Sequence, residues 1–579
     1  MDKNKVIRSH LSPYRGLESR RPWCRASSRP PTLVITVSVV AALLVGVVLF
    51  GVRLTPSGGN NTWVSAGVRD VLNAVSSKQG TTAGPLATVP DPRDRLLGGL
   101  LSPDFDESSC LSRYRAALYR RPSPHAISTY LISALRRYES LHRRCGPGTS
   151  AYARAVERLR ASSPNASTSS SSPSADDCSY LVWNPIEGLG NRILTITSGF
   201  LYALLTDRVL LLHSSGGALD DLFCEPFPGG STWILPEDDN DFPIRDMGSL
   251  NGGHHESLRS VLRRGEEPGA AGASPWLYVH LRHDYSKIHH DQQFFCDDTD
   301  AALRRVPWLV FQSDNYFVPG LFLIPRHEAE LSRMFPRRDL VFHHLGRYLF
   351  HPSNTVWDMV TRYHDEYFAK ADDERVGIQV RRFRWAPIST DELYGQILNC
   401  TQRETILPVP NVAATGGSDG EPAKQKAVLV VSLHGEYSEK LRDLYNNNNN
   451  GSTSTTGREA VSVHQPTHLG AQRSGVQEHN QKALAEMVLL SFSDAVVTTA
   501  VSTFGYVGQG LAGLRPWVLM SPVDGKAPDT PCRHAATMEP CFHAPPKYDC
   551  RAKTNGDAGR IVRHIRHCED FPQGVQLVE

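Results

Sequence analysis

The stretch YLVWNPIEGLGNRILTITSGFLYALLTDRVLLL, residues 180–212, predicts a strand, a helix and a second strand in immediate succession. The apolar runs YLVW (180–183) and RVLLL (208–212) are typical of buried strands, and a glycine-rich turn and a helical segment, Asn191–Thr206, lie between them. Two strands that are joined by a helix lie parallel in one sheet. The stretch therefore indicates an α/β fold.

Further β-branched runs repeat this alternation in the second half of the chain: RVGIQV (375–380), AVLVVS (427–432), AVVTT (495–499) and PWVLM (516–520). We therefore expect an α/β protein with two doubly wound, Rossmann-like domains. Ligands of such domains bind beyond the carboxyl ends of the strands. Residues that directly follow these runs are the first candidates for a functional site.

The composition is that of a large globular protein. Of the 579 residues, 40% are hydrophobic and 21% charged, which excludes a wholly disordered or collagen-like polymer. The 62 Lys and Arg residues nearly balance the 60 Asp and Glu residues, so the net charge of +2 gives no general case for nucleic acid as a partner. An anionic ligand must therefore be bound by a local site.

The N-terminal region predicts a membrane anchor. Residues 32–52, TLVITVSVVAALLVGVVLFGV, carry no charge, and as a helix they are long enough to cross a hydrocarbon core of about 30 Å. A cleaved signal peptide and a buried helix are the alternatives, but the first usually has a shorter apolar core and the second is rarely apolar all round. Basic residues dominate the preceding tail, residues 1–31, which places that tail in the cytosol and the remaining chain in a lumen.

The lumenal chain divides into a stem and a folded region. Residues 53–93 are rich in Gly, Ser, Thr and Pro, which is typical of a flexible stem. The folded region is expected to form an N-terminal domain over residues 94–370 and a C-terminal domain over residues 371–579. Segments of low complexity interrupt both domains and predict surface insertions at residues 161–177, 411–426 and 446–457.

The cysteines predict disulfides. Cys24 precedes the predicted membrane segment, and the other ten of the 11 cysteines follow it. An even number of cysteines in an oxidising compartment favours disulfide bonds, although the sequence does not give their pairing. A structural zinc site is the alternative because four histidines lie among the last four cysteines, but no C-x-x-C pair is present. The four histidines are His534, His543, His564 and His567, and sequons compatible with a lumenal chain occur at Asn60, Asn165, Asn399 and Asn450.

Three segments at strand ends carry residues that suit an anion or a sugar. GLGNR (188–192) joins a strand to a helix and places Gly190, Asn191 and Arg192 at the helix N-terminus. GIQVR ends in Arg381, whose planar guanidinium can bind two phosphate oxygens at once. STFG begins a helix with Ser502 or Thr503 as N-cap, Phe504 next, and Gly505 permitting a close approach. A tight turn, a solvated edge and an ordinary capped helix are the respective structural alternatives.

A histidine-rich segment before a predicted helix is the fourth candidate. His464 and Gln465, with His468 and His479 further on, offer imidazole and amide groups for sugar hydroxyls or phosphate oxygens, although such a histidine is more often structural. No D-x-D string directly follows a clear strand, so a metal on a nucleotide pyrophosphate is not favoured. The motifs of common hydrolases, zinc proteases and P-loop enzymes are absent.

Long stretches of the chain resemble one known family. They extend from residue 94 to residue 579 and include DRLLGGLLSPDFDESSCLSRY, GLGNRILT, FLYALLTDRV, FHHLGRYLFHP, GIQVR, HNQKALAEM, STFGYVGQGLAGLRPWVL and MEPCFH. The chain is similar to the plant xyloglucan-type α-1,2-fucosyltransferases, glycosyltransferase family 37. The resemblance implies a GT-B fold, GDP-fucose as donor, inversion at the anomeric carbon, no required metal or other cofactor, and a type II membrane protein of the Golgi.

The resemblance also implies roles for the candidate segments. Arg381 corresponds to the donor-phosphate arginine, and Ser502 to Gly505 correspond to the nucleotide-side loop. The GLGNR segment would face the donor across a cleft. The domain of residues 94–370 would then bind the acceptor and that of residues 371–579 GDP-fucose. The RFRW sequence after residue 380 and the polar insertions depart from the family pattern.

The implied reaction requires a base, because the acceptor hydroxyl loses a proton during attack. Asp314 follows the apolar run WLVF (308–311) and is the first candidate, with a turn-capping role as the alternative. Asp570, close to Cys568, is the second. The expected acceptor is the 2-hydroxyl of a galactosyl residue on a cell-wall glycan, either xyloglucan or arabinogalactan protein, and the expected partners include a second copy or a Golgi enzyme complex. A catalytically inactive, lectin-like Golgi subunit is the alternative of another class, but the intact Arg381 and STFG segments favour an enzyme.

Overall fold

The computed structural model describes residues 95–161, 178–214, 219, 221–229, 231–236, 242–369, 374–410, 424–446 and 459–579. All of them belong to one compact unit, Pro90–Glu579. The predicted tail, membrane segment and stem lie outside the described residues, and no helix within the described ranges is both long and apolar enough to cross a membrane.

The first half of this unit is built on a parallel sheet. Its strands are β1 (Ser179–Trp183), β2 (Arg208–Leu212), β3 (Trp276–Leu281) and β4 (Trp308–Ser313), in the order β2-β1-β4-β3. Helix α7 (Leu189–Thr206) joins β1 to β2, as the opening stretch of sequence predicts, although it begins two residues before the predicted start. The strand, helix, strand prediction for residues 180–212 is confirmed.

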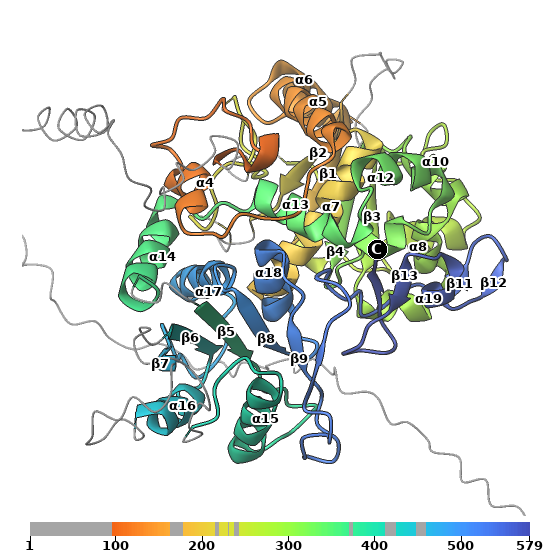
Figure 1. The fold of residues 1–579 in the computed structure, drawn as a ribbon. Coiled ribbons are helices and arrows are strands. Elements are labelled where there is room, and N and C mark those ends of the chain that lie inside the picture. The colour runs from red at the N-terminus through yellow and green to blue at the C-terminus, as the bar shows by residue number, and fades with distance from the viewer. Residues whose placement is uncertain are drawn as a thin grey trace, which may run out of the picture. The chain divides into compact units, whose positions relative to one another are not determined.

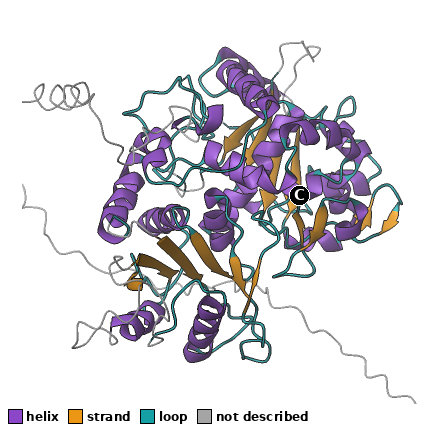
Figure 2. Cartoon of the chain, in the orientation of Figure 1, coloured by secondary structure: helices purple, strands orange, loops and turns teal. Residues whose placement is uncertain are grey.

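Short and medium helices surround this sheet (Figures 1 and 2). They are α4 (Leu111–Arg115), α5 (Thr129–Cys145), α6 (Ser150–Ala161), α8 (Leu258–Arg263), α9 (His289–Gln292), α10 (Asp297–Leu303), α11 (Val318–Leu321), α12 (Glu328–Met334) and α13 (Val341–Leu349). Helix α14 (Asn354–Tyr367) lies away from this sheet and packs against α17 (Gln477–Leu490) of the second half. Helix α7 is buried along almost its whole length, which explains why charged side chains are nearly absent from its sequence.

A second sheet forms from the later strand runs. It contains β5 (Glu374–Val380), β6 (Lys424–Ser432), β7 (Glu459–His464), β8 (Ala495–Thr499), β9 (Trp517–Leu519) and β10 (Cys532–His534), in the order β10-β9-β8-β5-β6-β7. All neighbours pair in parallel except β10, which is antiparallel to β9. The prediction of an α/β protein with parallel sheets is confirmed.

Helices cover both faces of the second sheet. Figure 1 shows α15 (Thr390–Arg403) and α16 (Glu436–Asn446) on one face and α17 (Gln477–Leu490) and α18 (Thr503–Ala512) on the other, toward the first half. Alternate side chains of β6 pack against the helices on opposite faces of the sheet, because successive side chains of a strand point to opposite faces. Val428 and Val430 pack with α15 and α16, whereas Leu429 and Val431 join the core that contains α17.

One of the predicted insertions is too long. Strand β6 begins at Lys424, inside the insertion predicted over residues 411–426. Lys426 is buried because its amino group pairs with the Glu374 carboxylate at 3.0 Å and donates to the Ile406 carbonyl at 3.2 Å. A lysine in a low-complexity segment indicates a solvated loop, and the ion pair across β5 and β6 overrides that pattern.

The largest of the hydrophobic clusters extends across both sheets. It joins α7 and α13 of the first half to α17 and α18 of the second, and it includes residues of the C-terminal segment such as Phe542, Ile565 and Val575. The division between domains at residue 370 therefore stays a prediction.

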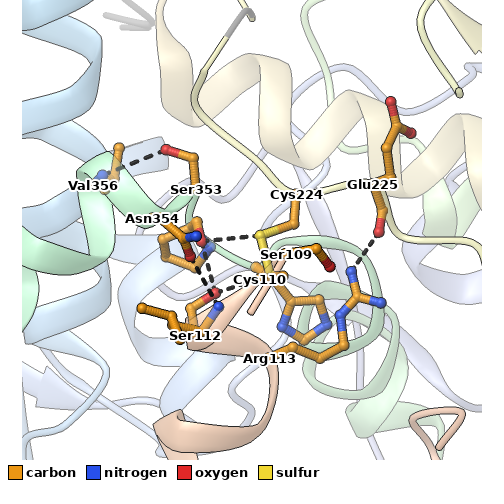
Figure 3. The surroundings of a disulfide bond; sticks show 12 residues. Ser109, Cys110, Ser112, Arg113, Cys224, Glu225, Ser353, Asn354 and Val356 are labelled. Atoms are coloured by element: carbon orange, nitrogen blue, oxygen red, sulfur yellow. Dashed lines mark hydrogen bonds between the residues drawn. A yellow bond between two sulfur atoms is a disulfide. The ribbon is translucent and has the colours of Figure 1, made fainter. Parts of the chain in front are cut away.

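Disulfides link distant parts of the chain. All ten cysteines after the predicted membrane segment are paired, which confirms the disulfide prediction and leaves no thiol among them for zinc: Cys110–Cys224, Cys145–Cys178, Cys296–Cys550, Cys400–Cys532 and Cys541–Cys568. Figure 3 shows the first pair, beside which Arg113 donates to the Glu225 carbonyl and Ser112 donates to the Pro352 carbonyl at 2.7 Å.

The C-terminal segment returns to the first half. Cys550 is bonded to Cys296, and the backbone amides of Lys547 and Tyr548 donate to the Gln292 side chain. The segment contains β11 (Tyr548–Asp549), β12 (Thr554–Asn555), α19 (Ala558–Ile561), β13 (Ile565–His567) and β14 (Val575–Leu577). Its contacts place residues after 540 beside α9 and Cys296.

Candidate functional site

Both sheets have a topological switch point, the place where the order of strands reverses along the sheet. In the first sheet it lies between β1 and β4, and in the second between β5 and β8. Ligands of open α/β sheets bind outside the carboxyl ends of the strands at these points. The segments that follow β1, β4, β5 and β8 contain Asn191, Asp314, Arg381 and Ser502, so most of the predicted site residues lie at the two switch points.

Asn191 joins the two switch points directly. Its side-chain oxygen accepts from the Thr503 hydroxyl at 2.8 Å, and its amide nitrogen donates to the Asp314 carbonyl at 3.1 Å. Gly190 allows this contact, because a Cβ at that position would lie 2.8 Å from the Thr503 hydroxyl oxygen and 3.0 Å from the Phe504 nitrogen. The first turns of α7 and α18 are thus packed against each other.

Arg192 is a buried cation in the first turn of α7. It is 8% exposed, and its Nε and Nη1 atoms have no hydrogen-bond partner among the described residues. Burial lowers the pKa of its guanidinium. A buried guanidinium with donors to spare can bind an anion that enters the site.

Arg381 follows β5 at the switch point of the second sheet. Its backbone amide donates to the Thr499 hydroxyl at 3.0 Å, and its Nη2 atom donates to the Gln472 side chain at 2.9 Å. Burial lowers its pKa, and no carboxylate pairs with it in the part of the chain that the structure describes. Gln472, which the sequence analysis did not select, lies next to the GLGNR turn, because a Cβ on Gly188 would lie 2.3 Å from its amide nitrogen.

The STFG segment begins α18, as predicted. Ser502 is the N-cap residue, but its side chain makes no capping hydrogen bond to the helix. Gly505 is needed for packing, because a Cβ there would lie 2.9 Å from the Thr498 Cβ atom on β8. Since the first-turn amides have no side-chain cap, the positive end of α18 can interact with a ligand anion.

Asp570 holds the turn before α18. Its carboxylate accepts from the Val501 backbone amide at 2.9 Å and from the Tyr506 hydroxyl. Val501 has a φ of 63°, a left-handed conformation that is strained for a β-branched residue. Burial and the Asp570 charge raise the pKa of Tyr506. The contacts of Asp570 are those of a residue that positions the turn.

Asp314 is paired with a histidine that the sequence analysis missed. Its Oδ1 atom accepts from the His283 backbone amide at 2.8 Å, and its Oδ2 atom lies 2.7 Å from His283 Nδ1. The hydrogen bond to Asp314 raises the pKa of His283. The Asp314 side chain is 10% exposed and that of His283 45% exposed, so the imidazole is the accessible member of the pair.

A second histidine lies near this pair. His543 Nε2 is 3.1 Å from the Tyr506 hydroxyl, which also donates to Asp570. Burial lowers the pKa of His543, whereas the negative charges of Asp570 and Asp314 act in the opposite direction. The ends of β3 and β4, the start of α18 and the C-terminal segment therefore contribute acid and base groups to one region.

Two predicted site residues have other contacts. His464 stacks on Tyr367 with ring centroids 4.8 Å apart, at the edge strand β7. The Gln465 amide donates to the carbonyls of Ser432, His434 and Thr467 and so organises its own loop. Neither contacts Arg381 through a described hydrogen bond, and their donor-binding role stays a prediction.

A cavity opens near the end of β5. Its volume is about 660 Å³, and its lining includes Trp385, Pro387 and Ser389 after β5 and Pro522, Asp524 and Gly525 after β9. Phe383 stacks on Trp385 with ring centroids 5.1 Å apart. Cavities of this size hold small molecules.

The described residues offer one cluster with metal-ligand atoms, Cys541, Cys568 and Asp570. Both sulfur atoms belong to the Cys541–Cys568 disulfide and are not thiolates. Thiolate is the form of cysteine that binds a metal, so this cluster does not fit one.

Sequence and structure comparisons agree on a family. Residues 70–551 match the xyloglucan fucosyltransferase family. Galactoside 2-alpha-L-fucosyltransferases of Arabidopsis thaliana and Pisum sativum are 48% and 47% identical, with 84% of this chain and 83% and 82% of those proteins covered. The structure of an Arabidopsis thaliana FUT1 mutant in complex with GDP is similar over 84% of this chain and 100% of that one, with 48% identity and a TM-score of 0.74. The resemblance seen in the sequence is thus confirmed, and the chain belongs to the xyloglucan fucosyltransferase family.

Proposed function

We propose that this protein transfers L-fucose from GDP-fucose to the 2-hydroxyl of a galactosyl residue on a cell-wall glycan, with inversion and with xyloglucan as the acceptor. The observation that carries the proposal is a pair of guanidinium groups, those of the buried Arg192 and the half-buried Arg381, which lie at the two switch points without an ion-pair partner among the described residues. Two such cations match the charge of a nucleotide diphosphate. The relatives named as galactoside 2-alpha-L-fucosyltransferases support the same donor and linkage.

The leaving group is the GDP pyrophosphate. As the bond between the fucosyl anomeric carbon and the phosphate oxygen breaks, its electron pair stays on GDP, and the sugar becomes oxocarbenium-like. Arg381 and the amides at the start of α18 stabilise the negative charge that develops on the diphosphate. These residues take the place of a metal in our proposal, so the reaction is expected to proceed without one.

His283 is the proposed proton acceptor. The acceptor oxygen forms the new bond to the anomeric carbon while its proton moves to the imidazole. Asp314 orients the ring through Nδ1 and stabilises the imidazolium that forms, the arrangement found in histidine–aspartate pairs of hydrolases. Both oxygens of Asp314 are already engaged, Oδ1 by the His283 backbone amide and Oδ2 by the ring, which favours the positioning role over direct proton transfer.

The wider setting is part of the same proposal. We infer a GT-B arrangement, with the sheet of β1–β4 on the acceptor side and that of β5–β10 on the GDP-fucose side. The segment of residues 32–52 anchors the protein as a type II Golgi membrane protein, where it acts alone, as a homodimer or in an enzyme complex.

The decisive experiment uses the full-length protein in detergent with GDP-fucose and a panel of xyloglucan, arabinogalactan and unrelated glycans. Fucose on the 2-hydroxyl of galactose in xyloglucan is the expected product. Activity is expected to persist in excess EDTA, because the developing charge is met by arginine and helix amides. Hydrolysis of GDP-fucose without transfer to any glycan would contradict the acceptor assignment, and a strict manganese requirement would contradict metal independence.

A further inference from the structure

A second cavity lies beside the amino ends of strands β8 and β9 of the second sheet. Its volume is about 640 Å³, and it is lined by Ala495 at the start of β8, Trp517 at the start of β9, and Gly513 after α18. The candidate site lies at the carboxyl ends of the same strands. Five residues of β8 span about 16 Å, so the two places are separate.

The loop of residues 120–125 forms one wall of this cavity and is fixed to the structure. The Ser123 hydroxyl lies 3.0 Å from His343 Nε2, and His125 Nε2 lies 2.9 Å from the Gly513 carbonyl. His343 Nδ1 lies 2.9 Å from the Gly510 carbonyl. These imidazoles form hydrogen bonds with the carbonyl groups at the end of α18. Without such partners, those carbonyl groups would repel an anion.

The charges that line the cavity do not balance. Three acidic residues line it, and each already has an arginine: Asp494 is paired with Arg121 at 2.9 Å, Asp339 with Arg337 at 2.7 Å, and Glu579 with Arg337 at 3.8 Å. Arg120 and Arg515 remain, and neither has an ion pair or a side-chain hydrogen bond among the described residues. Arg347 also lines the cavity and donates to His343 at 3.1 Å.

Arg120 gives the strongest indication that the cavity binds an anion. Its Nε atom is buried without a hydrogen-bond partner, and burial lowers the pKa of its guanidinium to about 10. The Phe492 ring lies 5.8 Å from its guanidinium carbon. Burying a guanidinium without an acceptor is costly, and a ligand that supplies oxygen atoms offsets that cost.

We propose that this cavity, between the amino ends of β8 and β9 and the loop of residues 120–125, is a second anion site that binds an oxyanion group, a phosphate or a carboxylate, through Arg120 with Arg515 at its rim. The stacked rings of Trp517 and His534, 4.4 Å apart, provide a flat surface beside it. An anion carried by a sugar or another ring would bind both features. The proposal is independent of the donor site, which lies at the carboxyl ends of the strands.

The test measures binding of anions by the shift of the thermal midpoint of the full-length protein. Inorganic phosphate and glucuronate are titrated separately at constant ionic strength, with chloride as the reference salt. A background that carries both Arg192→Gln and Arg381→Gln removes the two cations of the proposed donor site. Stabilisation by phosphate alone or by glucuronate alone identifies the source of the oxyanion, and stabilisation by neither overturns the proposal.

Variants assign the effect to the cavity. Arg120→Gln is expected to weaken anion binding by about tenfold or more, because it removes a charge-assisted contact. Arg515→Gln, at an exposed position where folding is not at risk, is expected to weaken it several-fold, and Arg154→Gln on α6 is the matched control. If Arg120→Gln does not fold, the Arg515 variant decides the matter. Equal binding by wild type, Arg515→Gln and Arg154→Gln would contradict the assignment.

Discussion

The two switch points of this protein carry opposite kinds of chemistry. At the first sheet, β3 and β4 are followed by His283 and Asp314, whose side chains are hydrogen-bonded at 2.7 Å. At the second sheet, β5 is followed by Arg381, a half-buried cation without a carboxylate partner in the described part of the chain. The same topology thus places a proton-handling pair on one side and a free charge on the other. A strand end indicates where a ligand binds, but the residue that follows it decides what happens to the ligand.

The largest effect is expected at the cationic side. Arg381→Lys should lower the rate of fucosyl transfer by about 100- to 1,000-fold, because a point ammonium cannot replace the two-pronged contact with a diphosphate. Initial rates and GDP affinity of the purified variant measure it. Arg384→Lys, three residues further and exposed, is the control and should remain near wild type. Normal turnover with unchanged GDP affinity in Arg381→Lys would remove this residue from the site.

The proton-handling side should respond differently. Asp314→Asn is expected to lower the transfer rate by about 100-fold while GDP affinity stays near that of wild type, because the amide cannot stabilise an imidazolium. Single-turnover rates and GDP binding, measured on folded protein, separate the two quantities. An Asn variant that transfers fucose at a near-normal rate would leave Asp314 as a turn residue and shift attention to His543.

The pH dependence sharpens the same contrast. His283 must be neutral to accept a proton, and its pKa is raised by Asp314, so the rate should increase with pH through a pKa above the usual value of 6.5. In Asp314→Asn the acid limb of the profile should move to lower pH, because the partner charge is gone. Arg381→Lys should lower the whole profile without moving that limb. An acid limb at the same pH in wild type and Asp314→Asn would argue against His283.

The smallest effect concerns the contact that joins the two sides. Gly190→Ala should lower the free energy of unfolding by about 1–3 kcal/mol, since the added methyl group meets Thr503 and Phe504 at 3.0 Å or less. Urea unfolding measures the difference. Gly395→Ala in α15, where a Cβ meets nothing within 4 Å, is the control and should stabilise the protein slightly through helix propensity. Equal losses in both variants would show that the contact between α7 and α18 is not tight.

Local patterns predicted more of this fold than of its site. The β1, α7, β2 unit and strand β8 follow from residues that are neighbours in sequence, and the sequence places them almost to the residue. The sequence does not indicate His283, because its partner lies 31 residues away and because no strand is predicted for WLYVHL (276–281). Asp570 was selected as a base, yet its contacts with Val501 and Tyr506 depend on a return of the chain that no local pattern indicates.

The return of the C-terminal segment means that the first half cannot complete its disulfides and its core until the end of the chain has been synthesised. Cys296 and Cys550 are 254 residues apart, and the first half receives part of its core from residues after 540. At a synthesis rate of about 5–20 residues per second, Cys296 waits about 13–50 s for its partner to be made. Throughout that interval its thiol must avoid the cysteines that are made earlier. The order of thiol oxidation, and not the order of synthesis alone, therefore decides whether the newly made chain reaches its active form.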